Sequence, residues 1–198
     1  MKKHHLCFLL TLTLLPTAVF AEGETDVSIN ETNFPDANFR TVVKEYDIDK
    51  DENLSRLEIE AVKEIKCYYK DIRSLTGIEY FTALQTLECY SNLLTSLDIS
   101  RNTALKSLDC ANNQLTSLDV SRNTALESLN CADNQLTALD ISQNTALESL
   151  ICAGNKLTAL NVSGHATLEF LNCSTNELTE LNVDQNAVLN TLNCLNNR

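Results

Sequence analysis

The amino-acid sequence predicts a mainly β fold, in which about seven coils of 21 to 22 residues stack behind a small helical segment. Three observations lead to this prediction. Six cysteines recur at a spacing of 21 residues, the first being Cys89 and the last Cys194. Each lies in the same short pattern of leucines and an asparagine, whereas residues 22–61 do not repeat. A period of this length is typical of chains that fold as stacked units, each burying its apolar face against its neighbours.

The composition fits one soluble domain, since 43% of the 198 residues are hydrophobic and 21% are charged. There are 27 acidic and 15 basic residues, and the formal net charge is -12. This charge argues against nucleic-acid phosphates and anionic lipids as partners. Only 4 glycines are present, so glycine-rich phosphate loops are not expected either.

Residues 1–21 have the pattern of a secretory signal peptide. Lys2 and Lys3 precede an apolar run over residues 6–15, and small or tolerated residues, Val19 and Ala21, stand three and one positions before Glu22. A membrane-spanning helix needs about 18 to 20 apolar residues, and neither this run nor any later one is that long. We therefore expect cleavage after Ala21 and a mature chain without a transmembrane segment, either secreted or at the cell surface.

The repeated pattern is L-x-x-L-x-C-x-x-N. The second Leu and the Cys are two residues apart, so both side chains point to the same face of a short strand. A degenerate copy around Ile65 and Cys67 precedes the six intact copies, which brings the number of coils to about seven. The intact copies contain Cys89, Cys110, Cys131, Cys152, Cys173 and Cys194.

This pattern resembles the leucine-rich repeat, L-x-x-L-x-L-x-x-N/C-x-L, with Cys in place of the third Leu. The resemblance covers residues 62–198 and implies a right-handed solenoid with a parallel β-sheet. The second half of each coil has a frame of its own, such as L-x-x-L-x-V-x-x-N over residues 115–123. That half is either a strand or a turn-rich return segment, so a two-faced parallel β-solenoid stays open as the alternative.

Three columns of polar or reactive residues run along the coils. We expect the asparagine that ends each pattern, from Asn92 to Asn197, to bond backbone groups in the turns. We expect the cysteines to be buried free thiols, because an odd number remains after residue 21 and none has the spacing of a zinc site. The second column of acids and amides is expected to cap turns, with a calcium or catalytic acid column as the alternative. Its members are Asp98, Asp119, Asp140, Asn161 and Asn182.

Residues 47–58 look like an EF-hand calcium loop. Its positions 1, 3, 5, 7, 9 and 12 are Asp47, Asp49, Asp51, Asn53, Ser55 and Glu58. Position 6 is Glu52 where the motif has Gly, and a left-handed backbone costs a non-glycine residue about 1 kcal/mol. Apolar residues at helical spacing precede the loop, after Pro35, and Ser55 and Glu58 form a capping box behind it. We expect weak, structural calcium binding, with a Kd of about 10⁻⁴ to 10⁻³ M; the alternative is a solvated acidic turn.

Partner contacts are expected on the outward positions of the strands. The main candidates lie on the first two coils and are Lys66, Tyr68, Tyr69, Glu88 and Tyr90. Ile151 and Phe170 form a smaller apolar spot. Exposed aromatic side chains on a rigid strand face are reasonable binding anchors. The alternative is that the three tyrosines pack against the N-terminal segment.

An Asp-rich helical segment followed by Cys-bearing repeats resembles bacterial exported leucine-rich repeat proteins of the internalin-like and surface-antigen type. The resemblance implies adhesin-like binding of an extracellular or cell-surface protein. A passive surface scaffold and a glycan-binding solenoid are the alternatives. Catalysis is not expected, because His165 is the only histidine after residue 21 and no nucleophile motif is present.

The expected organisation is a signal peptide (1–21), a helical N-terminal cap with the acidic loop (22–61), and the solenoid (62–198). The last pattern ends at Asn197 with no polar capping segment behind it. A solenoid without a cap exposes the apolar side of its last coil. We therefore expect either that the sequence is truncated or that this end pairs with something, for which end-to-end association with a second copy is one candidate.

Overall fold

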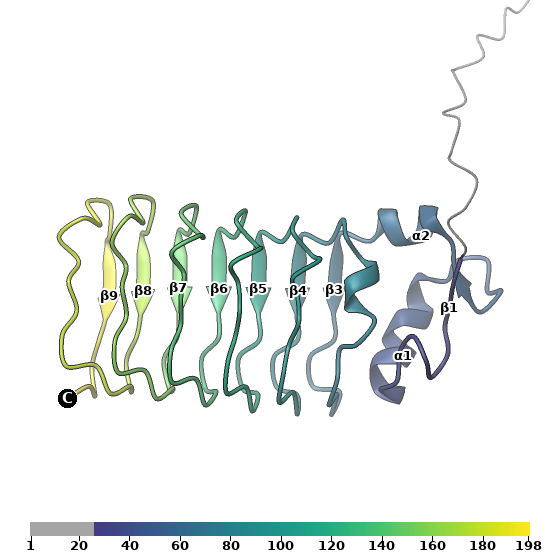
Figure 1. Ribbon diagram of the computed structural model, residues 1–198, viewed down its shortest axis with the longest axis horizontal. Helices are drawn as coiled ribbons and strands as arrows, with labels where there is room; N and C mark the ends of the chain where they lie inside the picture. The colour runs from purple at the N-terminus through teal and green to yellow at the C-terminus, as the bar shows by residue number, and fades with distance from the viewer. Residues whose placement is uncertain (1–25) are drawn as a thin grey trace, which may run out of the picture.

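The computed structural model describes residues 26–198, which form a stack of coils with a small helical unit at one end (Figure 1). The expected signal peptide lies outside the described residues. Among residues 26–198, no helix is long and apolar enough to cross a membrane. The predicted mainly β solenoid is confirmed.

Seven short parallel strands form one sheet in which the strand order follows the chain order (Figure 1). Equivalent residues of adjacent coils are paired, as Leu87 with Leu108 and Leu108 with Leu129. The strands are β3 (Glu64–Lys66), β4 (Thr86–Glu88), β5 (Ser107–Asp109), β6 (Ser128–Asn130), β7 (Ser149–Ile151), β8 (Phe170–Asn172) and β9 (Thr191–Asn193). The 21-residue period of the sequence is therefore the register of the sheet.

The second half of each coil is a return segment of turns and bends rather than a strand. In the first coil it includes a short 3-10 helix, η2 (Ile78–Tyr80). The described residues contain a single parallel sheet, so the leucine-rich repeat arrangement holds and the two-faced β-solenoid is not formed. The apolar residues of the return segments still point inward, as Leu115 and Val120 do, which are fully buried.

The cysteine column lies in the core. Six of the seven cysteines that the structure describes are buried, Cys194 is exposed, and all seven are free thiols. Burial raises the pKa of Cys67 and of Cys110 to about 12, and that of Cys173 to about 11. The expectation of buried thiols that act as small apolar residues is thus confirmed for all but the last coil.

The asparagine that ends each pattern joins its own coil to the one before. The amide nitrogen of Asn134 donates to the carbonyls of Cys110 at 3.0 Å and Cys131 at 3.2 Å, and its oxygen accepts from Leu115 N at 3.0 Å. These backbone groups are buried and need partners. The predicted role of this column is confirmed, and Asn113, Asn155 and Asn176 make the same contacts.

A second buried column stands at the opposite corner of the coils, and the repeat pattern by itself does not predict its role. Asn123 is fully buried and its amide nitrogen donates to the carbonyls of Ile99 and Asn102 in the preceding coil, at 3.1 and 2.9 Å. His165 takes the same place one coil after Asn144, with Nε2 lying 3.0 Å from the carbonyl oxygen of Ile141. The column consists of Asn102, Asn123, Asn144, His165 and Asn186.

The N-terminal unit has the predicted helix, loop and helix. Its elements are β1 (Val27–Ser28), α1 (Ala37–Val43), η1 (Lys44–Tyr46), β2 (Asn53–Leu54) and α2 (Arg56–Ala61). The first helix begins after Asp36, which caps it by accepting from Asn38 N and Phe39 N. The capping box of Ser55 and Glu58 is present at the start of α2.

This unit is joined to the first coil by polar and apolar contacts. The second carboxylate oxygen of Asp36 accepts from Arg73 N at 2.7 Å and Ser74 N at 3.2 Å. Gly77 has a φ of 104°, and a Cβ atom there would collide with the ring of Phe34. The apolar residues of the unit and of the coils form one continuous core cluster.

We expect Asn134→Ala to lower the free energy of unfolding by about 2 to 4 kcal/mol, because buried backbone groups of two coils would lose their partners. Thermal or urea unfolding measures the change. The matched control is Gln135→Ala, which removes an exposed amide from the next position. Equal stability of the two variants would contradict the bridging role of the column.

We expect a thiol reagent at pH 8 to modify Cys194 quickly in the folded protein and the six buried cysteines only after unfolding. The reason is that only the thiolate reacts, and burial raises the pKa of the thiols. Counting the modified thiols before and after adding denaturant tests this. A marked deficit of thiols in denatured, unreduced protein would show disulfides instead.

Candidate functional site

Three tyrosines form an aromatic cluster on the outer face of the sheet, at its first two coils. The rings of Tyr68 and Tyr90 are stacked, with centroids 4.6 Å apart and planes within 11° of parallel. The ring of Tyr69 meets both edge-on, at 6.0 and 5.4 Å. Tyr69 is 73% exposed, and the other two are half-buried. We call Tyr68, Tyr69 and Tyr90 the tyrosine cluster.

The register of the sheet explains how residues 22 positions apart come together. Cys67 N donates to Glu88 O at 2.8 Å, and Tyr69 N donates to Tyr90 O at 3.3 Å. These two bonds hold Tyr68 and Tyr90 side by side. The structure therefore groups the predicted tyrosines with each other. The tyrosines at the junction of the N-terminal unit and the first coil are different ones, Tyr46 and Tyr80, against Phe81 and Phe34.

Tyr69 adopts a left-handed backbone conformation, with a φ of 53°. The equivalent residues of the later coils have the same conformation, and all but the β-branched Thr175 are small or suited to turns. They are Ser91, Asn112, Asp133, Gly154, Thr175 and Asn196. A bulky residue in this conformation is uncommon, and the cost for a residue with a Cβ atom is about 1 to 2 kcal/mol. The ring of Tyr69 is thus held in the cluster at the expense of some backbone strain.

Charged side chains lie beside the tyrosine cluster. Lys66 forms an ion pair with Glu64 at 3.0 Å, and the side-chain hydrogen bond and charge of Glu64 raise the pKa of Lys66. Glu88 and Asp109 are paired in register on β4 and β5. Desolvation, the neighbouring tyrosines, and then Glu88 and Asp109 raise the pKa of Tyr90. Both carboxylates are therefore within electrostatic reach of that ring.

The second predicted patch is smaller. Phe170 is paired with Ser149, and Ile151 with Asn172, on the adjacent strands β7 and β8. Both apolar side chains are half-buried on the outer face, but they stand at neighbouring positions and not opposite each other. They form a small apolar spot in which no rings are stacked, unlike the tyrosine cluster.

The acidic loop closes around the carboxylates of Asp47 and Glu58, both of which are buried. Asp47 accepts from Lys50 N at 2.7 Å and Glu52 N at 3.0 Å. Glu58 reaches back across the loop to accept from Ile48 N at 2.7 Å. Its hydrogen bond from the Ser55 hydroxyl lowers the pKa of Glu58.

The structure brings three of the six predicted calcium ligands together. One carboxylate oxygen from each of Asp47, Asp49 and Glu58 lies within 4.8 Å of the others. Of the other predicted ligands, the side chain of Asp51 accepts from Asn53 N and that of Ser55 donates to Glu58. Asn53 is predicted to ligate through its carbonyl, and its side chain accepts from the Ser28 hydroxyl. Desolvation and the charges of Asp51, Glu58 and Asp47 raise the pKa of Asp49.

The loop has a left-handed backbone conformation at the one position where its sequence differs from the EF-hand motif. Glu52, at the glycine position, has a φ of 65° and so takes up the left-handed conformation that the turn needs. Leu54, at the inward apolar position, is fully buried. The strand β2 that contains it pairs antiparallel with β1.

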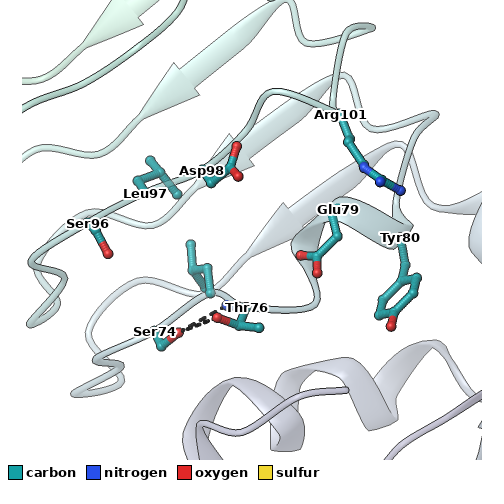
Figure 2. Close-up of a pocket in the computed structure, with 9 residues that line it drawn as sticks. Ser74, Thr76, Glu79, Tyr80, Ser96, Leu97, Asp98 and Arg101 are labelled. Atoms are coloured by element: carbon teal, nitrogen blue, oxygen red, sulfur yellow. Dashed lines mark hydrogen bonds between the residues drawn. The ribbon is translucent and has the colours of Figure 1, made fainter. Parts of the chain in front are cut away.

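A hollow of about 510 Å³ lies in the return segments of the first two coils, at a place that the sequence pattern does not predict (Figure 2). Tyr80 and Arg101 project from its rim, and Ser74 and Thr76 are joined by a hydrogen bond of 2.9 Å. Asp98 accepts from Ser100 N at 2.9 Å, and this bond lowers its pKa. Asp98 therefore caps a turn, as expected for its column. The hollow is lined by Ser74, Leu75, Thr76, Glu79, Tyr80, Ser96, Leu97, Asp98 and Arg101.

Comparisons with known proteins agree with the repeat pattern. The family described as Leucine Rich repeats (2 copies) matches residues 103–144. Internalin J of Listeria monocytogenes serotype 4b is 37% identical over 70 residues, which are 35% of this chain and 8% of that protein. This chain thus spans a small part of that relative's length.

Two solved structures from Listeria monocytogenes extend the similarity over 87% of the chain. The functional domain of InlJ, described as including a cysteine ladder, matches with a TM-score of 0.71 and 37% identity, over 43% of its own length. Internalin C2 matches with a TM-score of 0.78 over 79% of its length, and at 20% identity it supports the fold alone. Taken with the cysteine period and the parallel sheet, these similarities show that the chain has a leucine-rich repeat fold similar to that of the internalins.

Proposed function

We propose that this protein is secreted or held at the bacterial cell surface, where it binds an extracellular or cell-surface protein in an adhesin-like manner. The observation that carries the proposal is the tyrosine cluster, which presents stacked, partly exposed rings on a rigid sheet. Tyrosine has a large contact area and few rotatable bonds, so little conformational entropy is lost when it is buried in an interface.

The backbone strain at Tyr69 supports a binding role over a passive scaffold. An asparagine or glycine would fit that left-handed position better, as Asn112 and Gly154 do in later coils. Strain of this kind is often found where function requires a particular side chain. The outer positions of the middle coils have small side chains, such as Ser128 and Ala132. They favour a passive scaffold only for that part of the sheet.

A binding role also accounts for the polar residues better than catalysis does. His165 is buried, and both of its ring nitrogens face backbone carbonyl oxygens, so it holds a turn. The acids of the return segments cap turns in the same way, as Asp119 does for Ser121 N at 2.9 Å. Internalin-like proteins are typically non-enzymatic, which agrees with this assignment.

We also propose that the acidic loop binds calcium weakly and that the ion stabilises the N-terminal unit. The convergence of Asp47, Asp49 and Glu58 within 4.8 Å favours this proposal. Carboxylate oxygens are the ligands that calcium prefers, and an EF-hand loop supplies them from these positions. The unit packs against the first coil, so the ion would act on stability and not on chemistry.

Binding of the protein to an array of extracellular-matrix proteins and glycans tests the first proposal. We expect saturable binding to a protein that is lost in Tyr68→Ala/Tyr90→Ala, because hot-spot aromatics contribute at least about 2 kcal/mol each. Leu195→Ala is the control, since it removes an exposed apolar side chain from the equivalent position of the last coil. Unchanged binding by the double variant would reject the tyrosine cluster as the site, and binding to glycans alone would favour carbohydrate recognition.

Tyr69→Asn separates function from stability. We expect the stability of this variant to stay within about 1 kcal/mol of the unmodified protein, because relief of the left-handed strain offsets the loss of the edge-on ring contacts, and we expect it to bind the partner more weakly. Unfolding curves and the same array measure the two effects. A variant that gains stability and keeps full binding would show that the ring of Tyr69 is not used.

Calcium in millimolar excess is expected to raise the melting temperature by a few degrees, which corresponds to about 1 to 3 kcal/mol for a Kd in the weak range. Glu58→Gln removes a hydrogen-bonded carboxylate and lowers stability even without the ion. The decisive quantity is therefore the calcium-induced shift in each variant. We expect the shift to vanish in Glu58→Gln and to persist in the control Glu60→Gln. No shift in the unmodified protein would refute the site.

A further inference from the structure

The hollow in the return segments of the first two coils combines polar groups with apolar surface (Figure 2). Its volume of about 510 Å³ lies in the range of small-molecule sites, about 300 to 1,000 Å³. Leu75, which is buried, and Leu97, which is half-buried, contribute the apolar surface. Tyr80 and Arg101 stand at one end and Ser96 at the other. None of the lining residues belongs to the tyrosine cluster, so the two places are separate.

Two hydrogen-bond donors of this hollow are not engaged by the protein. Arg101 is exposed, and within residues 26–198 its guanidinium has no hydrogen-bond or ion-pair partner. The exposed hydroxyl of Ser96 has none either in this part of the chain. By contrast, the guanidinium of Arg40 donates to Phe34 O at 2.6 Å. The N–H groups of Arg101 are therefore available to a ligand.

The acceptors of the hollow are two carboxylates. One oxygen of Glu79 accepts from Gly77 N at 2.7 Å, which holds the side chain in place. Asp98 is exposed and accepts from Ser100 N at 2.9 Å, within its own turn. The hydrogen bonds from Ser100, and then the charge of Arg101, lower the pKa of Asp98. A carboxylate has about four lone-pair sites, so both groups can accept further hydrogen bonds from a ligand.

Neighbouring donors and acceptors beside an aromatic ring match the chemistry of a neutral saccharide. Adjacent hydroxyls of a sugar can donate to a carboxylate and accept from a guanidinium at once, and hydrogen bonds to charged groups are among the stronger ones. The C–H groups of a sugar ring pack on the exposed part of an aromatic ring such as Tyr80. That ring is held in place by Phe34, with centroids 5.7 Å apart, and by the bond of its hydroxyl to Asn33 at 3.3 Å.

Other classes of ligand fit the hollow less well. An anion would meet the negative charges of Glu79 and Asp98 against the single positive charge of Arg101. A cationic side chain has only donors, so it would leave Arg101 without an acceptor. An extended peptide has both kinds of group, but it pairs best with the backbone of a sheet edge, and the groups presented here are side chains.

A second hollow of about 420 Å³ adjoins the first, over the next coil. The wall that the two hollows share consists of Ser96, Leu97 and Asp98. The second hollow repeats the pair of charges, because hydrogen bonds from Ser121, and then the charge of Arg122, lower the pKa of Asp119. In the coil after that, Asp140 is followed by Gln143 in place of an arginine. The repeated pair suits a ligand of at least two linked sugars.

We propose that this hollow binds a neutral oligosaccharide, with Glu79 and Asp98 accepting hydrogen bonds from its hydroxyls and Arg101 donating to them. A second sugar lies over Asp119 and Arg122 of the next coil. The site goes beyond the proposed function, since it is separate from the tyrosine cluster and takes a different class of ligand.

The test is an NMR titration of the isotope-labelled protein with the neutral oligosaccharides cellotetraose, maltotetraose and tetra-N-acetylchitotetraose. Tetragalacturonic acid is the anionic comparison, and the blocked peptide Ac-Ala-Ala-Ala-Ala-NH₂ is the peptide comparison. We expect a neutral oligosaccharide to shift the backbone signals of residues 74–80 and 96–101, and to do so equally at low and high salt because it carries no charge to be screened. We expect the acid and the peptide to leave these signals unchanged.

Arg101→Ala removes the free guanidinium, and we expect it to weaken oligosaccharide binding at least about five-fold. The folded structure should be unaffected, because the described residues make no hydrogen bond or ion pair with this side chain. The matched control is Arg73→Ala, which removes an exposed arginine of the first coil that does not line the hollow.

Asp98→Asn replaces a charged acceptor by a neutral one, and we expect it to weaken binding roughly two- to ten-fold. The turn should persist, because Asn161 caps the equivalent turn by accepting from Ser163 N at 2.9 Å. Asp140→Asn is the control, since it makes the same change in the coil that has no arginine beside it.

The inference is overturned if none of the neutral oligosaccharides shifts these signals, if the acid or the peptide shifts them more strongly, or if Arg101→Ala binds as well as Arg73→Ala. Tyr68→Ala/Tyr90→Ala should leave oligosaccharide binding unchanged, and a loss would place the sugar on the tyrosine cluster instead. The proposed function fails separately, because the absence of any protein partner in the array does not affect the titration.

Discussion

The hydrogen bonds of the buried asparagines are the interaction on which the rest of this structure depends. A coil of 21 residues turns sharply at both ends of its strand, and each turn leaves backbone groups inside the molecule without a partner from a regular ladder. Side-chain amides supply those partners: Asn134 bonds backbone groups of its own coil and of the preceding one, and Asn123 bonds backbone groups of the preceding coil. The spacing of the coils, and hence the register of the strands, follows from this bridging.

The same constraint explains why inward positions stabilise the stack while outward positions can vary. Leucine, cysteine and asparagine occupy the positions that the stack requires, while the outward positions of β3 to β9 contribute little to it. The side chains at the outward positions can therefore differ from coil to coil. Only at the first two coils are those positions filled with stacked rings and opposed charges, and there a residue as poorly suited as Tyr69 is retained in a left-handed turn.

Much of the fold could be predicted from the sequence, because the period of 21 residues is directly the register of the sheet. The capping box of Ser55 and Glu58 could also be predicted, because it depends only on residues that are close together in the chain. The stacking of Tyr68 on Tyr90 was only partly predictable, because side-chain orientation depends on packing across coils. The hollow beside Arg101 and the bridging role of Asn123 follow from the path of the return segments, which the repeat pattern leaves open between strand and turn.

The junction at Phe34 and Gly77 has a mechanical consequence. The aromatic ring occupies the space that any larger residue at position 77 would need, and the amides of residues 73 and 74 are tied to Asp36. The helical unit is consequently fastened to the first coil by both packing and hydrogen bonds. A force applied at the first coils would therefore act on these contacts before it could separate the helical unit from the stack.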